Sequence, residues 1–289
     1  MGGVVNQFAG GDPEYLRAVQ YRDAAPLTAR ATLHTKYGTR PIPWFEWVVD
    51  QIDWPPGSAV LEVGCGPRWF WAEAAARLPA GLRVVLVDQS PGMIDEAVRR
   101  ARATGSLGTC DGQVADAQAL PVRDAGFDIA IANHMLYHVP DPERAVTELA
   151  RVLSPSGVLL AAANGHRNLD QLWEIQAEVF GTPARSETTT AFGMESGPPI
   201  LRRGFDAVEW HDAPDELVCT DPDDVFAYLT SSPPGDTASP AQRRVLADAI
   251  DRRFDAGGGV LRVTKQTGVF VGRGPRIRPG DDAATRGPP

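Results

Sequence analysis

The chain lacks the features that mark membrane-spanning and secreted proteins. No window approaches the roughly 20 consecutive apolar residues that a helix needs to span a bilayer, which excludes an integral membrane protein. The first residues have no basic segment followed by an apolar core, which argues against secretion. Asn6 stands where the myristoylation pattern requires Ser or Thr, so Gly2 is not expected to carry a lipid. We therefore expect no membrane partner.

Cysteine is scarce and scattered. Cys65, Cys110 and Cys219 form neither a CxxC pair nor a metal-ligand spacing, so reduced thiols in a cytoplasmic protein are expected. Three of the five histidines are isolated along the chain, and isolated histidines are usually structural or exposed; they are His34, His166 and His211. The sequence therefore predicts no metal site.

Positive charge is also in short supply. The chain has 28 basic and 37 acidic residues and a formal net charge of −9, which disfavours a nucleic-acid partner. Lys36 and Lys265 are the only lysines, a bias typical of a high-GC genome rather than of a function. With 43% hydrophobic and 22% charged residues the composition is that of a globular protein, and a small molecule is the expected partner. The sequence leaves open whether the chain forms a homo-oligomer.

Segments with strand and helix patterns alternate between residues 59 and 163. Strands are predicted at 59–63, 82–88, 112–116, 127–133 and 158–163, and helices at 71–78, 91–103 and 141–153. The last of these helices has Asp141 in the N-cap position and Pro142 at its first residue. Such alternation predicts βαβ units and an α/β fold with a largely parallel sheet covered on both faces.

Other elements flank this core. Helical patterns between residues 15 and 52 predict an N-terminal helical cap over residues 1–56, followed by the main domain at 57–274. After the fifth strand the alternation stops, and residues 165–204 are predicted to be an insertion that covers the acceptor. Strands at 205–219 and 260–271, with helices at 222–229 and 240–254 between them, complete the same sheet. The tail at 275–289 is expected to be disordered.

The glycine-rich loop Gly64-Cys65-Gly66 lies between a strand and a helix, where glycines allow a ligand to approach the backbone closely. A dinucleotide fingerprint requires a third glycine where Trp69 stands, and no Lys-Ser/Thr follows to make a phosphate-binding P-loop. Glu62 would repel a pyrophosphate but suits a positively charged or zwitterionic ligand. S-adenosylmethionine fits this description, and Cys65 contributes a small side chain to the loop.

Acidic residues end the next two strands. Asp88 is placed to accept hydrogen bonds from both ribose hydroxyls, a feature shared with NAD enzymes. Asp116 can accept from the adenine amino group, with the backbone of Ala117 nearby, and Met93 can pack on the adenine face. Ligands of open parallel sheets bind at the carboxyl ends of the strands, so these residues are expected to converge.

The order of these motifs resembles that of the class I S-adenosylmethionine-dependent methyltransferases. The resemblance covers about residues 57–165 and rests on Val60-Leu61-Glu62-Val63-Gly64-Cys65-Gly66, Asp88, Ala115-Asp116-Ala117, Phe127-Asp128, Asn133-His134-Met135-Leu136-Tyr137-His138-Val139-Pro140-Asp141 and Arg151-Val152-Leu153-Ser154-Pro155-Ser156-Gly157. Residues 33–37 and 44–47 are similar to a small-molecule subgroup from actinomycete natural-product pathways.

The resemblance implies a Rossmann-like sheet of seven strands, mostly parallel with the last strand antiparallel. It also implies S-adenosylmethionine as cofactor, S-adenosylhomocysteine as its product, and no metal. The predicted cofactor-binding residues are Glu62, Gly64, Cys65, Gly66, Asp88, Gln89, Met93, Asp116, Ala117, Asn133, His134 and Tyr37. One departure concerns Arg68, which replaces the third glycine usual in the family and either crowds the methionine end of the cofactor or turns outward.

Three residues are candidates for catalysis. His134 and His138 follow the fourth strand, where either is placed to act as a general base for O-methylation; the alternative is that backbone hydrogen bonds fix both rings. Tyr21, like Tyr37, belongs to the predicted cap, where its hydroxyl can orient the acceptor or the sulfonium; helix packing is the alternative for both tyrosines. Aromatic residues of the insertion are candidates for an apolar acceptor pocket or for helical core: Trp173, Phe180 and Phe192.

The leading hypothesis is an enzyme that transfers a methyl group to a small molecule of secondary metabolism by in-line displacement. N-, O- and C-methylation all remain open, and methylation of an olefinic or aromatic carbon is compatible with the aromatic residues near the loop. Two alternatives are a methyltransferase relative that performs another reaction, such as cyclisation, and a non-catalytic S-adenosylmethionine-binding regulator.

Overall fold

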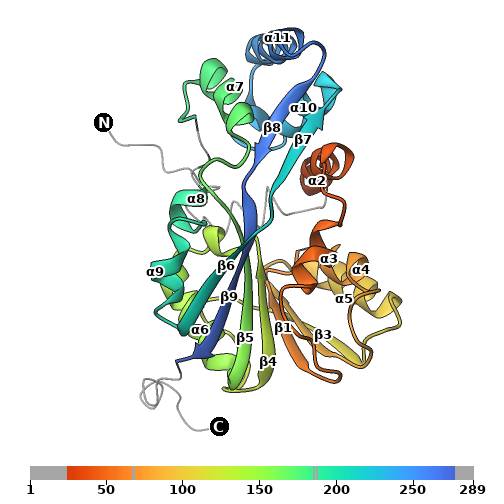
Figure 1. Ribbon diagram of the computed structural model, residues 1–289, viewed down its shortest axis with the longest axis vertical. Helices are drawn as coiled ribbons and strands as arrows, with labels where there is room; N and C mark the ends of the chain where they lie inside the picture. The colour runs from red at the N-terminus through yellow and green to blue at the C-terminus, as the bar shows by residue number, and fades with distance from the viewer. Residues whose placement is uncertain (1–24, 67–68, 185, 187, 277–289) are drawn as a thin grey trace.

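A seven-stranded sheet forms the centre of the computed structural model, which describes residues 25–66, 69–184, 186 and 188–276 (Figure 1). Its strands are β1 (Ala59–Val63), β2 (Arg83–Asp88), β3 (Thr109–Val114), β4 (Phe127–Asn133), β5 (Leu153–Asn164), β6 (Phe205–Asp212) and β9 (Thr267–Pro275). They lie in the order β3-β2-β1-β4-β5-β9-β6, with β9 antiparallel to both of its neighbours. The predicted α/β fold with an antiparallel last strand is confirmed.

Helices cover both faces of this sheet. The helices α6 (Pro142–Val152) and α9 (Gly197–Leu201) pack on one face with the inward residues Leu61 and Ala130. The opposite face, with Val60 and Ile129, packs against α3 (Trp44–Val49), α4 (Trp69–Glu73) and α5 (Pro91–Ala103). Neighbouring residues of one strand thus enter different cores, as the alternation of a strand requires.

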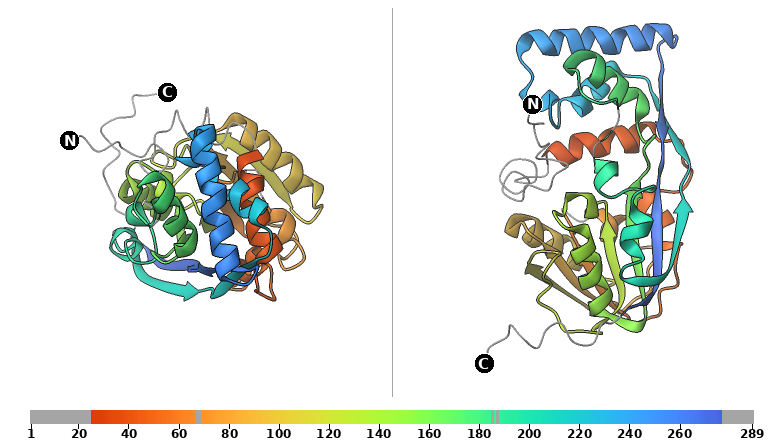
Figure 2. Two further views of the ribbon diagram at one scale, coloured as in Figure 1. Left: turned by 90° about the horizontal axis from the view of Figure 1, so that it is seen from above. Right: turned by 90° about the vertical axis from the view of Figure 1, so that its left-hand side faces the viewer.

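A second layer of helices stands beyond the carboxyl ends of β1, β4 and β5 (Figure 2). It consists of α2 (Ala25–Tyr37), α7 (Asp170–Phe180), α10 (Pro222–Leu229) and α11 (Pro240–Ala256), which share a third core with the two-stranded sheet of β7 (Asp215–Cys219) and β8 (Leu261–Lys265). The strands β6 and β7, and likewise β8 and β9, run on from one sheet to the other, so a long ribbon joins the two layers (Figure 1).

The predicted continuous strands at 205–219 and 260–271 are therefore wrong, because each is interrupted where it passes between the sheets. Pro214 has no backbone N–H to donate at the first break. At the second break Gln266 turns its backbone to the loop after β5: its N–H donates to Asn168 Oδ1 at 3.1 Å, and its carbonyl accepts from Gly165 at 2.8 Å. Each of the two chain segments therefore leaves the hydrogen-bond ladder of one sheet at the break and joins the ladder of the other sheet after it.

Several predicted boundaries also shift. The helix predicted at 71–78 is α4 (Trp69–Glu73), because a turn closed by Arg77 N–H on Ala74 O follows it at 2.9 Å. Pairing with β2 sets β3 at Thr109–Val114 instead of 112–116. Leu153 pairs with Phe127, so β5 begins directly where α6 ends. The predicted cap of α6 is confirmed, with Asp141 Oδ1 accepting from Arg144 N–H at 3.0 Å.

The remaining short elements are η2 (Leu136–His138), α8 (Thr188–Ala191) and η3 (Gly235–Thr237). None of the helices in the described ranges combines the length and apolar character needed to cross a membrane. The predictions made for Tyr21, Arg68 and most of the tail fall on residues outside the described part of the chain.

Candidate active site at the carboxyl ends of the strands

The glycine loop turns sharply at the end of β1. Gly64 has a φ of +68°, and a Cβ at this position would lie 2.6 Å from Met135 Cβ, so only glycine fits. The backbone amides of Gly64 and Cys65 both donate to Val87 O, at 2.7 and 3.1 Å, which ties the loop to β2. Gly66 has a φ of +52°, and, its chain neighbours apart, no atom of the described residues lies within 4 Å of where its Cβ would be. The loop is thus tightly held on one side and open on the other.

Asp88 lies beside this open side. Its Oδ2 accepts a hydrogen bond from Gly66 N–H at 2.9 Å, and its Oδ1 accepts one from Ser90 N–H at 2.9 Å. Burial raises the pKa of the Asp88 carboxyl, and hydrogen bonds from the amides of Ser90, Gly66 and Gln89 partly oppose this shift. The last residue of β2 is therefore bonded directly to the loop, as the sequence predicts for residues at neighbouring strand ends.

Glu62 is buried on the α4 face of β1, with 2% of its surface exposed. Its Oε2 accepts a hydrogen bond from Trp71 Nε1 at 2.6 Å, and the Trp71 side chain is itself buried. The bond fixes a carboxylate directly below the glycine loop. The negative charge that the sequence assigns to this loop is thus supplied by a side chain that an indole holds in place.

The predicted adenine-binding residues follow β2 and β3. Met93 is buried at the start of α5, where its N–H donates to Ser90 Oγ, and Gln89 is half-buried between the two elements. Asp116 is exposed and accepts from the backbone amide of Gln118 at 2.9 Å, whereas the neighbouring Ala117 is buried. These residues lie at the same edge of the sheet as Asp88.

Unsatisfied polar atoms mark the end of β4. The Nδ2 and Oδ1 atoms of Asn133 are buried and find no hydrogen-bond partner among the described residues. The next residue, His134, has a left-handed backbone with a φ of +53°, and its buried Nδ1 equally lacks a partner within the described ranges. Buried polar groups without partners are uncommon, so this strand end has the chemistry of a binding site for a polar ligand.

Burial, together with the nearby charges of Lys265 and His138, lowers the pKa of His134 to about 4. The ring is therefore neutral near pH 7, and it lies 5.4 Å from the ring of Trp44, centroid to centroid. A group with so low a pKa is a weak proton acceptor. The ring of His138 packs on Tyr137 at 4.5 Å, and its backbone N–H donates to Met135 O at 2.9 Å.

Sequence reasoning missed part of this site. His34 is not isolated in space: burial lowers its pKa to about 3, and the nearby charges of Lys265 and His134 act in the same sense. Its buried Nδ1 has no partner in the part of the chain that is described. The signal in the sequence is slight, namely that Lys265 is one of two lysines. Arg40 stacks on Trp44, and nothing in the sequence pattern points to it.

Other predicted residues lie elsewhere. Tyr37 packs in the core of the second layer, and its hydroxyl donates to Asp224 Oδ2 at 2.7 Å. The aromatic residues of the insertion do not form one pocket. Phe192 is fully buried under the large sheet against Phe270, whereas Trp173 and Phe180 pack at the edge of the core around α7. Across the described ranges, no group of three or more His, Cys, Asp or Glu residues is arranged to hold a metal ion.

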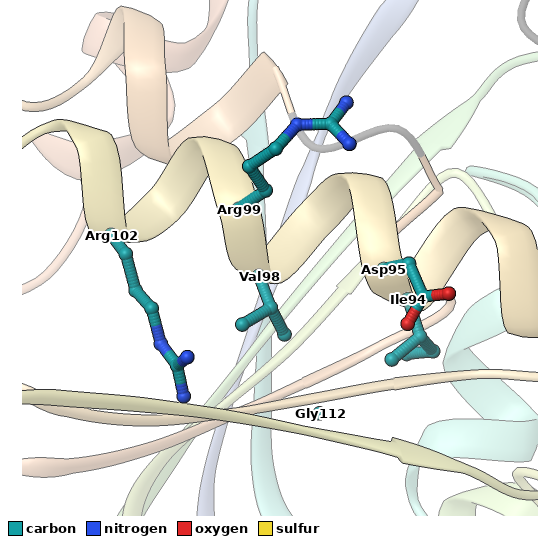
Figure 3. A pocket seen from close by; sticks show the side chains of 6 residues that line it. All are labelled: Ile94, Asp95, Val98, Arg99, Arg102 and Gly112. Atoms are coloured by element: carbon teal, nitrogen blue, oxygen red, sulfur yellow. The ribbon is translucent and has the colours of Figure 1, made fainter.

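A shallow surface pocket lies away from these strand ends, between α5 and β3 (Figure 3). Arg102, Val98 and Ile94 point from the helix toward β3, while Arg99 points away from it. A Cβ on Gly112 would come within 2.5 Å of Ile94 Cγ2, so this glycine allows the helix to pack closely on the strand. The pocket therefore reflects helix–sheet packing rather than the convergence of site residues.

Comparison with known proteins agrees with this geometry. Residues 61–161 match the family model described as a methyltransferase domain. The chain is 32% identical to a malonyl-[acyl-carrier protein] O-methyltransferase of Serratia marcescens, over 44% of this chain and 46% of that protein. It is 28% identical to the methyltransferase GfsG of Streptomyces halstedii, over 61% of this chain and 63% of that protein.

Solved structures share the fold at low sequence identity. The [4+2]-cyclase SpnF matches with a TM-score of 0.55 and 19% identity, over 88% of this chain and 94% of that one. A phosphoethanolamine N-methyltransferase of Haemonchus contortus, in complex with S-adenosylhomocysteine, matches with a TM-score of 0.54 and 17% identity, over 96% of this chain and 62% of that one.

The strand order, the glycine loop and Asp88 define a Rossmann-like methyltransferase fold. Together with the family match over residues 61–161, they support a methyltransferase domain of the class I S-adenosylmethionine-dependent type in this part of the chain. The first curated relatives are matched over 32%, 46% and 48% of their own lengths, so the likeness extends over half of those proteins or less.

Proposed function

We propose that the protein transfers the methyl group of S-adenosylmethionine to a small-molecule acceptor of secondary metabolism. The observation that carries the proposal is the bond between Gly66 and Asp88, which places an acidic side chain beside an open glycine turn. The match to a methyltransferase domain and the similarity to the methyltransferase GfsG of Streptomyces halstedii support the reaction, and the resemblance of residues 33–37 and 44–47 to an actinomycete natural-product subgroup supports the pathway. The reaction is an in-line displacement in which acceptor, methyl carbon and sulfur align.

The residues at the strand ends fit this cofactor. The space beside Gly66 admits close approach of a ligand to the backbone. Asp88 keeps acceptor capacity on both carboxylate oxygens, as two ribose hydroxyls require, and Asn133 has both amide atoms unsatisfied by any described residue. We assign the adenine end to Met93, Asp116 and Ala117. When bound, S-adenosylmethionine supplies an electrophilic methyl group on a positively charged sulfur.

The chain's own contribution is positioning and the exclusion of water. Glu62 holds negative charge below the loop, where it stabilises a cationic ligand. The second helical layer stands over the strand ends and is placed to cover a bound acceptor (Figure 2). The low pKa of His134 supports a role as hydrogen-bond donor or acceptor in preference to proton abstraction. N-, O- and C-methylation remain alternatives for the unidentified acceptor.

A second candidate is a reaction other than methyl transfer, such as cyclisation, at the same strand ends. The observation that supports this candidate is that the [4+2]-cyclase SpnF shares the fold across most of both chains. Fold alone does not assign a reaction, so this alternative rests on the weak basicity of His134 as well. The two candidates differ in whether S-adenosylhomocysteine is formed during turnover. A third candidate is a protein that binds S-adenosylmethionine without catalysis. Such a protein would form no S-adenosylhomocysteine and would leave every acceptor unchanged.

We place the protein in a reducing compartment, the cytoplasm, because its three cysteines are buried thiols. Two measurements test the function. Calorimetry with S-adenosylmethionine should show binding, and the absence of binding would contradict all three candidates. Neighbouring genes encode enzymes whose products are candidate acceptors. Incubation of the protein with methyl-labelled S-adenosylmethionine and these products should label one of the products. Binding with conversion of an intermediate but no label would instead favour the cyclase.

A further inference from the structure

A cluster of charged side chains is buried where the two sheets join. Asp215, the first residue of β7, pairs in register with Lys265, the last residue of β8. Lys265 Nζ lies 3.0 Å from Asp215 Oδ2, and Arg40 Nη2 lies 4.0 Å from the same oxygen. The side chains of Lys265, Asp215 and Arg40 are 11%, 4% and 10% exposed. Two cations and one anion are thus withdrawn from water together.

Asp215 is already fully engaged. Its Oδ1 accepts hydrogen bonds from the backbone amides of Thr39, Arg40 and Glu216, at 2.9, 3.0 and 2.9 Å, and from Thr39 Oγ1 at 3.1 Å. The carboxylate therefore fastens the segment after α2 to β7 while it balances only one of the two cations. Asp212 also attracts Arg40 but is exposed to solvent. One positive charge in this buried cluster remains uncompensated, which is unfavourable without a further anion.

The guanidinium of Arg40 has a donor to spare. Its Nη2 donates to Ala213 O at 2.9 Å, whereas Nη1 is buried without an acceptor anywhere in the described residues. The group lies over the rings of Trp44 and Trp47, 5.2 and 5.4 Å from their centroids. The aromatic rings fix the plane of the guanidinium, so its unpaired N–H groups have a defined direction. An oxygen ligand would satisfy them.

Ring nitrogens without partners lie on residues that are coupled to this cluster. Trp44 Nε1 and the Nδ1 atoms of His34 and His134 are buried and lack partners within the part of the chain that is described. Lys265 contributes to the lowered pKa values of both histidines, about 3 and about 4, so both rings lie within its electrostatic reach and are neutral near pH 7. Trp44 connects the cluster to the strand ends through its ring contact with His134.

We propose that Arg40 and Lys265 bind a carboxylate of the acceptor, so that the acceptor is a carboxylic acid. This inference rests on the proposed methyltransferase function. A carboxylate carries the single negative charge that the buried cluster lacks, and its two oxygens match the planar fork of a guanidinium. Trp44 Nε1 adds a neutral N–H donor, and His34 Nδ1 adds another in the tautomer that carries its proton on this atom. The pair of cations is a specificity determinant, because a neutral acceptor would leave the Arg40 donor unsatisfied.

The amino-acid carboxylate of S-adenosylmethionine is the other source of this chemistry. Sheet order favours the acceptor. Lys265 lies just before β9, whose residue Thr267 pairs with Asn164 at the end of β5. The glycine loop follows β1, three strands away in the order β1-β4-β5-β9, which corresponds to roughly 14 Å. Lys265 therefore lies on the β9 side of the sheet, away from the glycine loop to which we assign the cofactor.

The test compares matched pairs of aromatic and aliphatic carboxylic acids with their primary amides, by calorimetry on the full chain saturated with S-adenosylhomocysteine. Wild-type protein should bind acids at least about tenfold more tightly than amides, as expected for charge-assisted hydrogen bonds. Arg40→Met and Lys265→Met should abolish this preference. Arg262→Met is the matched control, because Arg262 lies on the same strand with its side chain 66% exposed, and should keep it. Equal affinity of acids and amides for the wild type would overturn the proposal.

A second arm separates the two sources. S-adenosylhomocysteine carries the amino-acid carboxylate, and 5′-methylthioadenosine lacks it. If Lys265→Met leaves the affinity for both unchanged within about twofold, the site belongs to the acceptor. A selective loss of S-adenosylhomocysteine binding would assign the cations to the cofactor and overturn the acceptor assignment. If wild type binds neither nucleoside, the proposed function fails, while acid preference of the unliganded protein is still measured.

Arg40 is also part of the link between α2 and β7, so Arg40→Met is checked by thermal unfolding. Should that variant not fold, Arg40→Lys keeps the charge but loses the fork, and a smaller loss of acid preference is expected. Lys265→Met and the wild-type comparison decide the proposal in either case.

Discussion

The backbone amide of Gly66, in the loop after β1, donates a hydrogen bond at 2.9 Å to the carboxylate of Asp88, the last residue of β2. The bond joins the two features that best mark a nucleoside site in this fold, a glycine turn and an acid after the next strand. Because the same carboxylate also accepts from Ser90, its orientation is fixed before any ligand arrives. Such preorganisation reduces the entropy cost of binding.

The two loop glycines should differ in what they do when replaced. Gly66→Ala places a methyl group in open space, at a residue whose φ is positive. The backbone strain should lower the unfolding free energy by about 1 kcal/mol, and the methyl group should obstruct the ligand. Gly64→Ala adds a clash with Met135 and should cost about 3 kcal/mol or more. Denaturant unfolding and S-adenosylhomocysteine titration measure both effects. A Gly66→Ala variant that binds normally would contradict the assignment of the loop.

The bond from Trp71 to Glu62 should matter more than an ordinary indole hydrogen bond. Trp71→Phe leaves a buried carboxylate short of a donor and should lower the unfolding free energy by about 2 kcal/mol. Trp54→Phe is the control, since Trp54 donates to the neutral carbonyl of Val49 and its loss should cost about 1 kcal/mol. Equal losses of unfolding free energy in the two variants would show that the charge of Glu62 does not strengthen its hydrogen bond with Trp71.

Much of the fold was predictable from the sequence because its signals are local. The alternation of strands and helices, the cap at Asp141 and the acid at Asp88 each depend on a few neighbouring residues. The break at Gln266 could not be predicted from the sequence, because it depends on hydrogen bonds to Gly165 and Asn168, about a hundred residues earlier. Hydrogen bonds between residues so far apart in the sequence produce no periodic pattern from which they could be predicted.

The same limit applies to the site. Glycines and acids at strand ends are the motifs from which we predict the cofactor site, whereas the residues that we propose for the acceptor belong to no motif. Arg40 meets Asp215 across 175 residues, and Lys265 meets both only because two strands cross between sheets. His34 is isolated in the sequence for the same reason, although in the fold the charge of Lys265 helps to lower its pKa.

Stability should depend on pH through the buried histidines. In the folded chain the pKa of His34 is about 3 and that of His134 about 4, below the ordinary value of 6.5. The unfolded chain therefore binds more protons in this range, and stability should be full above pH 6.5 and fall as the pH drops toward 4. Calorimetric Tm values between pH 4 and 8 measure the fall.

His134→Gln should flatten this dependence, and His166→Gln, at a histidine whose side chain is 40% exposed, is the matched control substitution. An identical pH profile for the wild type and His134→Gln would contradict the burial argument.

Ligand affinity should depend on pH through Asp88. Its pKa is raised by burial, so its carboxylate is protonated at a higher pH than an ordinary aspartate and then loses acceptor capacity. Affinity for S-adenosylhomocysteine should decline on acidification, beginning above the range where exposed aspartates titrate. Asp88→Asn should bind weakly at every pH and lose this dependence. A pH-independent affinity in the wild type would argue against hydroxyl recognition by Asp88.

The most direct test of the account is the affinity of S-adenosylhomocysteine for the wild type, Asp88→Ala and Asp95→Ala, measured by isothermal titration calorimetry. Asp95 is the control because it is an exposed aspartate on the adjacent helix α5. We predict one site in the wild type, an unchanged site in Asp95→Ala, and a loss of about 10- to 100-fold in Asp88→Ala, as expected for hydrogen bonds to a charged group. Absence of binding in the wild type, or equal affinity in all three proteins, would contradict it.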